Sequence, residues 1–281
     1  MTLWPELADG TFSLGFKQAG PIRTRVLEAG VSGEPVIFIH GTAGHLEAYQ
    51  RNILAHAQRH RVLAIDMIGH GFTDKPDRPY EIRDYVQHLK DVIDSYGFDR
   101  VHLSGESLGG WIVTQFAIEH PDRVGKLVLN TAGGLNTDPA VMTRLREISL
   151  KAVQEPSREN VRKRLEWLVH DKTHVTDDLV EMRYRIYTQP GFAKAMENIL
   201  CLQIMEVRER NILREEDLRR IKVPTLVLWT DHDPTAGIPV GERFAQLIPN
   251  AKLTIFEGCG HWPQYEDAPR FNREHMDFLA S

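Results

Sequence analysis

The stretch VHLSGESLGG (residues 101–110) decides how this chain folds, because it joins a short apolar run to a glycine-rich turn. The segment that follows, LGGWIVTQFAIEH, is typical of a helix. Strand, G-x-S-x-G and helix form the context of a nucleophile elbow, a sharp turn that strains the backbone of Ser107. Gly105 and Gly109 lack the side chains that would clash there. An ordinary tight strand-to-helix turn would show the same five residues, so the rest of the sequence has to decide.

Five further apolar runs are too short for typical helices and lack clean alternation. They are PVIFIH (35–40), RVLAID (61–66), KLVLN (126–130), TLVLW (225–229) and KLTIF (252–256). Runs of this kind suit strands that are buried on both faces of a parallel sheet. An alternating pair near residues 11–17 and 22–28, with Gly20-Pro21 between them, predicts an edge hairpin.

Amphipathic segments alternate with these runs. Residues 82–96 place Ile82, Val86, Leu89 and Ile93 on one helical face. Helical patterns also cover residues 107–119, 239–248 and 269–279. This alternation predicts an α/β fold with a doubly wound, mostly parallel sheet.

The alternation stops between residues 135 and 215, a segment rich in Arg, Glu and Leu with breaks at Pro156 and Pro190. It predicts several helices and no strand. We expect a helical lid (135–215) inserted into a core domain formed by residues 1–134 and 216–281. Ligands of open α/β sheets bind outside the carboxyl ends of the strands, so a lid there would bury the substrate and exclude water. The apolar lid residues favour lid core over substrate wall: Met182, Tyr187, Phe192, Met196 and Met205.

Composition excludes several classes of protein. The 281 residues are 42% hydrophobic and 26% charged, which is ordinary for a soluble domain. A net charge of −5 without a basic block argues against a nucleic-acid partner. No apolar run predicts a membrane span, and MTLWPELADG lacks the core of a signal peptide. Cys201 and Cys259 form no disulfide framework, which fits a cytoplasmic protein. The 13 histidines show no metal-ligand spacing, so no metal is expected.

A serine nucleophile needs a base and an acid that orients the base, in the order Ser, Asp/Glu, His for this topology. TDHDP follows the run TLVLW and carries Asp231 and Asp233. EGCGHW follows KLTIF and carries His261. Both loops should lie beside Ser107. The alternatives are a structural loop histidine and turn-capping aspartates, and one of the two aspartates is expected to be a cap.

The oxyanion of such a reaction needs two backbone donors. HGTAG (40–44) offers the N–H of Thr42 or Ala43, and the N–H of Leu108 lies at the start of the helix after Ser107.

Together these residues resemble the α/β-hydrolase superfamily from about residue 22 to the C-terminus. The motifs HG, DMIGHGFTDKP, GESLGG, DHDP and GCGHW fall in the family's order and spacing. In this type of member the acid lies three residues after a glycine that ends the strand. Thr230 occupies that place here, which selects Asp233 over Asp231. Serine at the nucleophile position argues against haloalkane dehalogenases and epoxide hydrolases, which carry aspartate there. We expect Asp66 and the glycines after it to shape a loop.

Within the superfamily the chain is most similar to the meta-cleavage product hydrolases, which break a C–C bond during aromatic-ring catabolism. CGHWPQYEDAPRFNREHMDFL (259–279) and RYRIYTQPGFAKAM (183–196) carry this resemblance. It implies that Arg183, with Trp262, binds the substrate carboxylate, for which arginine is suited by its two parallel donors. Since Arg185 lies nearby, a solvated helix face is the alternative for Arg183.

The resemblance implies a substrate, a 2-hydroxy-6-oxohexa-2,4-dienoate, that is hydrolysed without a cofactor to 2-hydroxypenta-2,4-dienoate and a carboxylic acid. A carboxylesterase or lactonase with the same triad is the first alternative. A non-catalytic binding protein on the same scaffold is the second. The expected partner is a small molecule, and since many relatives form dimers, a homodimer remains open.

Four residues depart from the family's pattern. Thr42 and Ala43 replace glycines, Ala48 replaces an asparagine, and Glu106 replaces the asparagine before the nucleophile. These are positions that read the substrate. If the Glu106 carboxylate pointed into the pocket, it would repel an anionic substrate. We therefore predict that Glu106 turns away, or is paired with a cation or a histidine.

Overall fold

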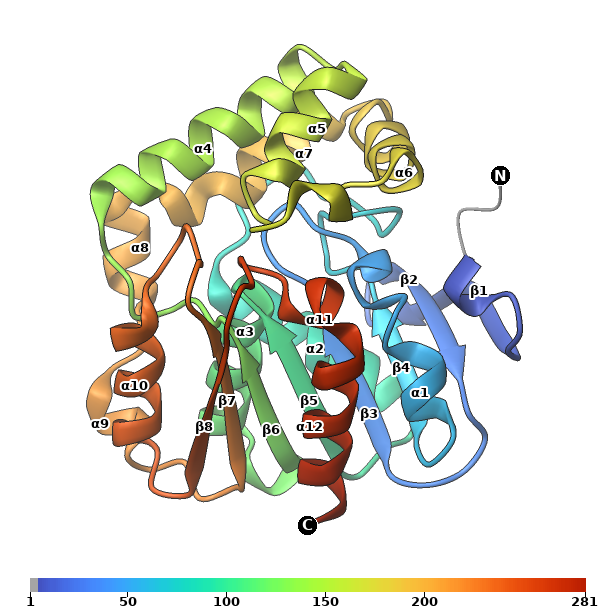
Figure 1. The fold of residues 1–281 in the computed structure, drawn as a ribbon, viewed down its shortest axis with the longest axis vertical. Helices are drawn as coiled ribbons and strands as arrows, with labels where there is room; N and C mark the ends of the chain where they lie inside the picture. Colours follow the sequence, from blue (N-terminus) through green and yellow to red (C-terminus); the bar gives the residue numbers. More distant parts are fainter. Residues whose placement is uncertain (1–4) are drawn as a thin grey trace.

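The computed structural model describes residues 5–281 (Figure 1); the first four residues of the N-terminal segment considered above as a signal peptide lie outside this range. Within residues 5–281, eight strands form one sheet in the order β1-β2-β4-β3-β5-β6-β7-β8. The strands are β1 (Phe12–Ala19), β2 (Ile22–Ala29), β3 (Pro35–Ile39), β4 (Arg61–Ile65), β5 (Val101–Glu106), β6 (Val124–Asn130), β7 (Thr225–Thr230) and β8 (Ala251–Phe256). At one edge β1 pairs antiparallel with β2, and β2 pairs antiparallel with β4. The other strands, β4, β3, β5, β6, β7 and β8 in sheet order, are parallel to one another.

The predicted strands and the edge hairpin are all present. Gly20 makes the hairpin turn with a φ of +54°, a value that glycine adopts without strain. One detail of the prediction is wrong. KLTIF was expected to be buried on both faces, but β8 is the other edge of the sheet, and Lys252 on it is exposed. An edge strand lacks a neighbour on one side, so its side chains are only partly covered.

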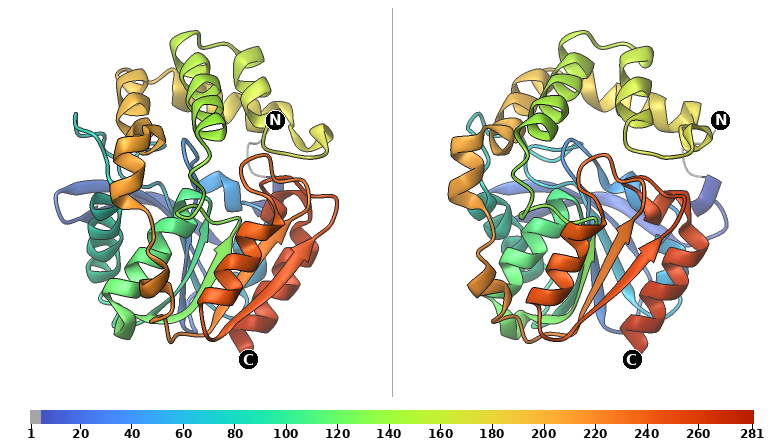
Figure 2. Two further views of the ribbon diagram at one scale, coloured as in Figure 1. Left: turned by 90° about the vertical axis from the view of Figure 1, so that its left-hand side faces the viewer. Right: turned by 60° about the vertical axis from the view of Figure 1, so that its left-hand side comes forward.

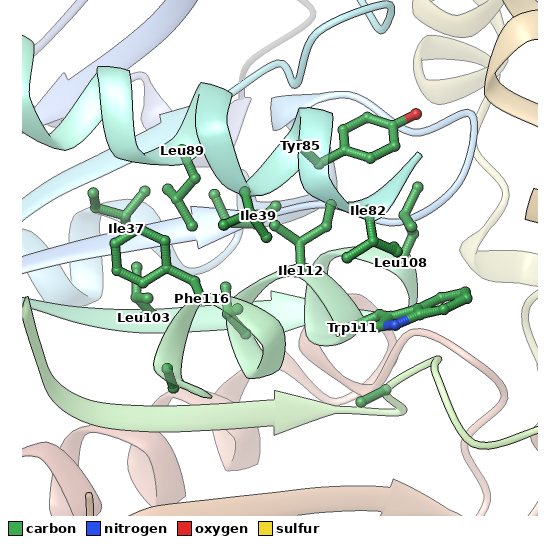
Figure 3. Close-up of a cluster of buried hydrophobic side chains, with 14 of the residues drawn as sticks. Ile37, Ile39, Ile82, Tyr85, Leu89, Leu103, Leu108, Trp111, Ile112 and Phe116 are labelled. Carbon is green, nitrogen blue, oxygen red and sulfur yellow. The ribbon is translucent and has the colours of Figure 1, made fainter. Parts of the chain in front are cut away.

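Two apolar cores cover the two faces of the sheet. On β3, Ile37 and Ile39 pack toward α2 (Ile82–Ser95), α3 (Leu108–Glu119) and α10 (Ile238–Leu247), and Figure 3 shows the α2 and α3 part of this cluster. Val36 and Phe38 point the other way, toward α1 (Ile53–Ala57) and α12 (Ala268–Ala280). Alternate residues of a strand face opposite sides, so one short run serves both cores.

The segment between β6 and β7 contains no strand among the described residues; besides two short 3-10 helices, Lys172–His174 and Leu200–Gln203, it has six α-helices. They are α4 (Pro139–Gln154), α5 (Arg158–Glu166), α6 (Asp177–Tyr187), α7 (Phe192–Ile199), α8 (Met205–Asn211) and α9 (Glu215–Leu218). Asp138, Ser157 and Thr176 begin α4, α5 and α6 by accepting a backbone N–H with their side chains. Figures 1 and 2 show α4 to α7 above the end of the sheet to which the parallel strands point.

A third apolar cluster joins these helices to the loops at the strand ends. It contains Leu165, Ile186 and Tyr187 from the helices, and Ala43 and Trp262 from the loops. The helical segment is therefore packed directly onto the loops that carry the candidate site. No helix in residues 5–281 is long and apolar enough to span a bilayer.

Candidate active site

Ser107 sits on a strained turn between β5 and α3. Its φ of +54° and ψ of −115° are unusual for a residue with a side chain. A Cβ atom at Gly105 would lie 2.3 Å from the backbone of Gly109, and one at Gly109 would lie 2.2 Å from the Ile39 carbonyl oxygen. The turn therefore requires glycine on both sides of the serine. An ordinary turn does not need this strain, so the geometry is that of a nucleophile elbow.

His261 and Asp233 meet in the loops after β8 and β7. The distance from His261 Nδ1 to Asp233 Oδ2 is 2.8 Å, and the His261 side chain is 3% exposed. The alternative of a surface-loop histidine is therefore wrong. Asp231 instead accepts the backbone N–H groups of Gly258 and Cys259, so it caps that turn. The structure brings Asp233, and not Asp231, to the imidazole.

The backbone of His261 is fixed on both sides. Its N–H donates to the Leu168 carbonyl at 2.6 Å, and its carbonyl accepts the Thr131 hydroxyl at 3.0 Å. Leu168 belongs to the helical segment and Thr131 follows β6. The imidazole is thus positioned by the sheet and by the helical segment together.

Glu106 faces the same imidazole from the other side. Its Oε1 lies 3.2 Å from His261 Nε2, and its Oε2 accepts the Gly41 N–H at 2.7 Å. The side chain is 2% exposed. Of the two predicted arrangements, Glu106 adopts the pairing with a histidine and does not turn away.

This pairing changes the chemistry of the imidazole. Burial would lower the pKa of His261, but the carboxylates of Asp233 and Glu106 outweigh it and raise the pKa to about 10. Nε2 is also the atom that would take the proton of the Ser107 hydroxyl. Glu106 therefore competes with Ser107 for the same nitrogen, and in this arrangement His261 is an imidazolium at neutral pH.

Two small cavities flank Ser107. The first, the Arg164 cavity, is also lined by Gly41, Glu106, Leu168, His261 and Trp262. The second, the Arg208 cavity, is also lined by Leu108, Trp111, Asn136, Met142 and Gln203. Ser107, Thr42, Leu145 and Thr235 line both cavities. Because Ser107 lines both cavities, a ligand attacked by this serine would extend into both of them.

The predicted oxyanion donors are placed differently. Thr42 lines both cavities and Leu108 lines the Arg208 cavity. Ala43 is fully buried with a φ of +59°, its carbonyl accepts the Tyr187 hydroxyl, and it lines neither cavity. Of the two alternatives for the second donor, the geometry favours Thr42.

Arg183 is completely buried on α6, so the alternative of a solvated helix face is wrong. Its Nε donates to His45 Nε2 at 3.3 Å, and its Cζ lies 5.3 Å from the centre of the Trp262 ring. Arg185 is the exposed arginine, and it pairs with Glu181. Arg183 lines neither of the two cavities beside Ser107, which leaves Trp262 as its link to the site.

Arg164 was not among the predicted site residues, although it is 1% exposed on α5 and lines a cavity with Ser107 and His261. Its Nε donates to the Ser149 hydroxyl at 3.0 Å, while Nη1 is buried without a hydrogen-bond partner. Burial lowers its pKa to about 10, so the guanidinium stays charged. The signal was present, because Arg164 lies three residues after Val161 and four before Leu168, on the apolar face of its helix.

The residues of the helical segment that line the two cavities differ in part from those expected. Met182, Tyr187, Phe192 and Met196 belong to the third core cluster, which agrees with the expected role as lid core. The apolar side chains of this segment that line the two cavities are Met142 and Leu145 of α4 and Leu168, which follows α5.

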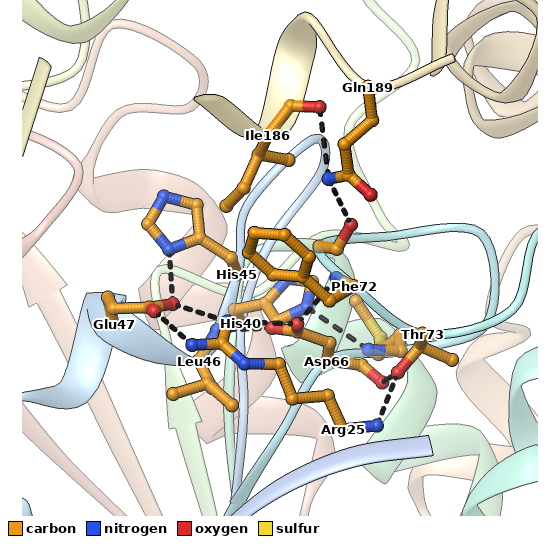
Figure 4. Close-up of polar contacts among 12 residues, drawn as sticks. Arg25, His40, His45, Leu46, Glu47, Asp66, Phe72, Thr73, Ile186 and Gln189 are labelled. Carbon is orange, nitrogen blue, oxygen red and sulfur yellow. Dashed lines mark hydrogen bonds and ion pairs between the residues drawn. The ribbon is translucent and has the colours of Figure 1, made fainter. Parts of the chain in front are cut away.

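Figure 4 shows a buried polar network around Arg25, Glu47 and Asp66. Glu47 accepts from Arg25 at 2.6 Å and lies 2.7 Å from His45 Nδ1, and His45 in turn contacts Arg183. Asp66 accepts the N–H groups of Leu46 and Phe72, as expected of a residue that shapes loops. Because His45 Nε2 accepts from Arg183, its Nδ1 carries the proton donated to Glu47. The network thus orients Arg183 toward the aromatic ring of Trp262.

Comparison with known proteins agrees with this geometry. A family model described as the alpha/beta hydrolase fold matches residues 34–268. The chain belongs to the alpha/beta hydrolase family.

Relatives of this alpha/beta hydrolase share most of its length. A protein of Pseudomonas putida F1 named 2-hydroxy-6-oxo-2,4-heptadienoate hydrolase is 35% identical, over 94% of this chain and 95% of that protein. One of Paraburkholderia phymatum, named 2-hydroxy-6-oxononadienedioate/2-hydroxy-6-oxononatrienedioate hydrolase, is 32% identical over 92% of this chain and 91% of its own. A crystal structure of a mutant of the meta-cleavage product hydrolase CumD has a TM-score of 0.85 at 30% identity, covering 95% of this chain and 97% of that one. The resemblance to the meta-cleavage product hydrolases is thereby confirmed.

Proposed function

We propose that this alpha/beta hydrolase uses Ser107 to cleave the C–C bond of a 2-hydroxy-6-oxohexa-2,4-dienoate, giving 2-hydroxypenta-2,4-dienoate and a carboxylic acid. The observation that carries the proposal is the strained Ser107 turn beside the Asp233–His261 pair, in a cavity with the buried cation Arg164. Glu106 lines the same cavity and its charge raises the pKa of Arg164, but its two oxygens are held by Gly41 and His261. Since Arg164 Nη1 is buried without a partner, an anionic substrate group can pair with it.

The reaction begins with ketonisation of the dienol, which makes the bond between C5 and C6 cleavable. His261, oriented by Asp233, then takes the proton of Ser107, and the serine oxygen attacks the C6 ketone. The N–H groups of Leu108 and Thr42 stabilise the oxyanion. Cleavage releases the dienoate and leaves an acyl-serine, which water hydrolyses with His261 as the base.

The base can act only when Nε2 is free and neutral. The bound substrate must therefore release His261 from Glu106, or the reaction must draw on the small fraction of neutral imidazole. Placing the C1 carboxylate against Arg164, with Arg183 and Trp262 behind it, supplies binding energy for this rearrangement. Arg164 joins the two residues expected from the sequence as a third group for the carboxylate.

A carboxylesterase or lactonase with the same triad is the competing function. It would share Ser107, Asp233 and His261 but would have no use for a buried cation in the Arg164 cavity. A ligand-binding protein on this scaffold would not need the strained serine, whose backbone costs about 1–3 kcal/mol of stability.

The test is turnover of ring-fission products by the purified protein, followed as loss of the yellow dienolate absorbance. Ser107→Ala should lower kcat by roughly 1,000-fold or more, as loss of a triad member normally does. Faster hydrolysis of p-nitrophenyl esters than of any ring-fission product would favour the esterase. A variant that kept turnover within a few-fold of wild type would refute the nucleophile assignment.

We also propose that the chain is organised as a core domain (1–134 and 216–281) with a lid (135–215) and that it acts in the cytoplasm on a small molecule. The net charge of −5 supports the absence of a nucleic-acid partner. Sedimentation analysis of the purified protein would decide between a monomer and a homodimer.

A further inference from the structure

The Arg208 cavity contains a second buried cation on the far side of Ser107. Arg208 lies on α8, is 4% exposed, and lines the cavity together with Ser107 and Leu108. Its Nε donates to the Asn136 carbonyl at 2.6 Å and its Nη1 to the Leu202 carbonyl at 3.2 Å. These bonds fix the guanidinium in place but do not neutralise it.

No acidic side chain offsets the charge of Arg208. Among residues 5–281 it takes part in no ion pair with a carboxylate. Burial lowers its pKa to about 10, and no neighbouring carboxylate raises the value again. The group is therefore a cation at neutral pH, held in a site from which water is largely excluded.

A neighbouring donor in the same cavity is also unsatisfied. The indole N–H of Trp111 is buried without a hydrogen-bond partner, and the Trp111 ring lies 4.9 Å from Arg208 Cζ. Gln203 adds an amide to the cavity wall, and its Oε1 likewise has no partner. A buried cation without a carboxylate and a buried N–H without an acceptor together match an oxyanion. A neutral alkyl or aryl group would leave the charge of Arg208 without a counterion and the Trp111 N–H without an acceptor.

Because Ser107 lines both cavities, the charge of Arg208 bears on which substrate the enzyme prefers. The inference rests on the proposed function, in which the dienoate half with its carboxylate occupies the Arg164 cavity. The other half, attached to C6, must then enter the Arg208 cavity. We propose that the C6 substituent ends in a second carboxylate bound by Arg208 and the Trp111 N–H, so that the preferred substrate is a dicarboxylate.

The first test uses the wild-type protein alone. Ring-fission products are compared that differ only at C6: a two-carbon chain ending in a carboxylate, the uncharged propyl group of similar size, and phenyl. The expected kcat/KM is roughly 10- to 100-fold higher for the carboxylate-bearing substrate, as a buried charge-assisted hydrogen bond provides. Equal or better turnover of the propyl or phenyl substrate would overturn the inference.

The second test removes the charge. Arg208→Gln should abolish this preference, mainly through KM, so that kcat/KM for the carboxylate-bearing substrate falls to about that for the propyl substrate. Arg210→Gln is the matched control, because Arg210 lies on the same helix, is exposed and pairs with Glu81. An equal loss for both substrates would assign Arg208 a structural role only and contradict the inference.

The two proposals fail in different ways. If propyl and phenyl substrates are cleaved but the carboxylate gives no advantage, the dicarboxylate inference alone is wrong. If no ring-fission product is cleaved while esters are, the proposed function is wrong and the inference falls with it.

Discussion

The strand ends and the helical segment supply groups of opposite charge to the site. The end of β5 brings the carboxylate of Glu106 and the loop after β7 brings that of Asp233, and the two hold His261 between them. The helices between β6 and β7 bring Arg164, Arg183 and Arg208, each nearly or fully buried and, within residues 5–281, none in an ion pair with a carboxylate. From this difference we propose that the strand ends carry the bond-making groups and that the helices carry the groups that recognise the substrate.

The functional side chains of the two regions are also held in place by different interactions. Ser107 is fixed by backbone bonds, since its N–H donates to Asn130 and its carbonyl accepts from Trp111 and Gly133. Arg164 is fixed by burial in an apolar cluster and by one hydroxyl, that of Ser149. Substitutions in the first region should therefore affect kcat, and substitutions in the second should affect KM and substrate choice. The following predictions test that division.

The largest effect is expected at the acid of the strand-end region. Asp233→Asn should lower kcat by roughly 1,000- to 10,000-fold, because the amide favours the wrong tautomer of His261 and cannot stabilise the imidazolium. Asp231→Asn is the matched control two residues away and should stay within about threefold. Steady-state kinetics on one ring-fission product measures both. A reversal of the two effects would reassign the acid to Asp231.

A smaller and selective effect is expected in the helical region. Arg164→Gln should lower kcat/KM for a dienoate by roughly 10- to 100-fold, mostly through KM, because it removes a charged donor from the carboxylate. Arg158→Gln on the same helix is the control, since that side chain is 61% exposed. If Arg164→Gln also slowed hydrolysis of a neutral ester equally, Arg164 would serve the fold and not recognition.

The pH profile tests the contact between Glu106 and the imidazole. A general base must be neutral, so kcat/KM should rise with pH toward the His261 pKa of about 10. Glu106→Gln removes one of the two carboxylates, leaving Asp233 on the ring and the cation Arg164 nearby. The pKa should fall, and the rising limb should move to lower pH by roughly 1–3 units. An unchanged limb would show that the Glu106 contact is absent in the working enzyme.

The smallest effect is expected at Ser149. Ser149→Ala removes the hydroxyl that accepts from Arg164 Nε, which leaves that buried donor unpaired. We expect KM for the dienoate to rise by roughly 2- to 10-fold with little change in kcat, because the guanidinium loses its fixed orientation. Ser149→Thr, which keeps a hydroxyl, should restore most of the loss. A fall in kcat with constant KM would place Ser149 in the chemistry of the strand-end region.

Much of the strand-end region could be predicted from local patterns. The G-x-S-x-G turn, the two later loops and the apolar runs are each only a few residues long, and strand ends of a parallel sheet meet at one edge. The choice of Asp233 came from the family's spacing, and the 2.8 Å contact with His261 agrees with it. The edge position of β8 could not be predicted, because strand order is set by pairing between distant segments.

The sequence by itself determined the fold class, the strand runs, the turn at Ser107 and the two loops that face it, because these follow from short-range sterics and periodicity. The positions of the buried charged side chains around Ser107 depend on the tertiary structure alone. Glu106 is held between Gly41 and His261, residues far away along the chain. Arg164 and Arg208 look like ordinary surface residues of Arg-rich helices until packing buries them beside Ser107. Whether a charged side chain is solvated or buried beside the site depends on which surfaces pack together. Packing between distant segments cannot be read from a local sequence pattern.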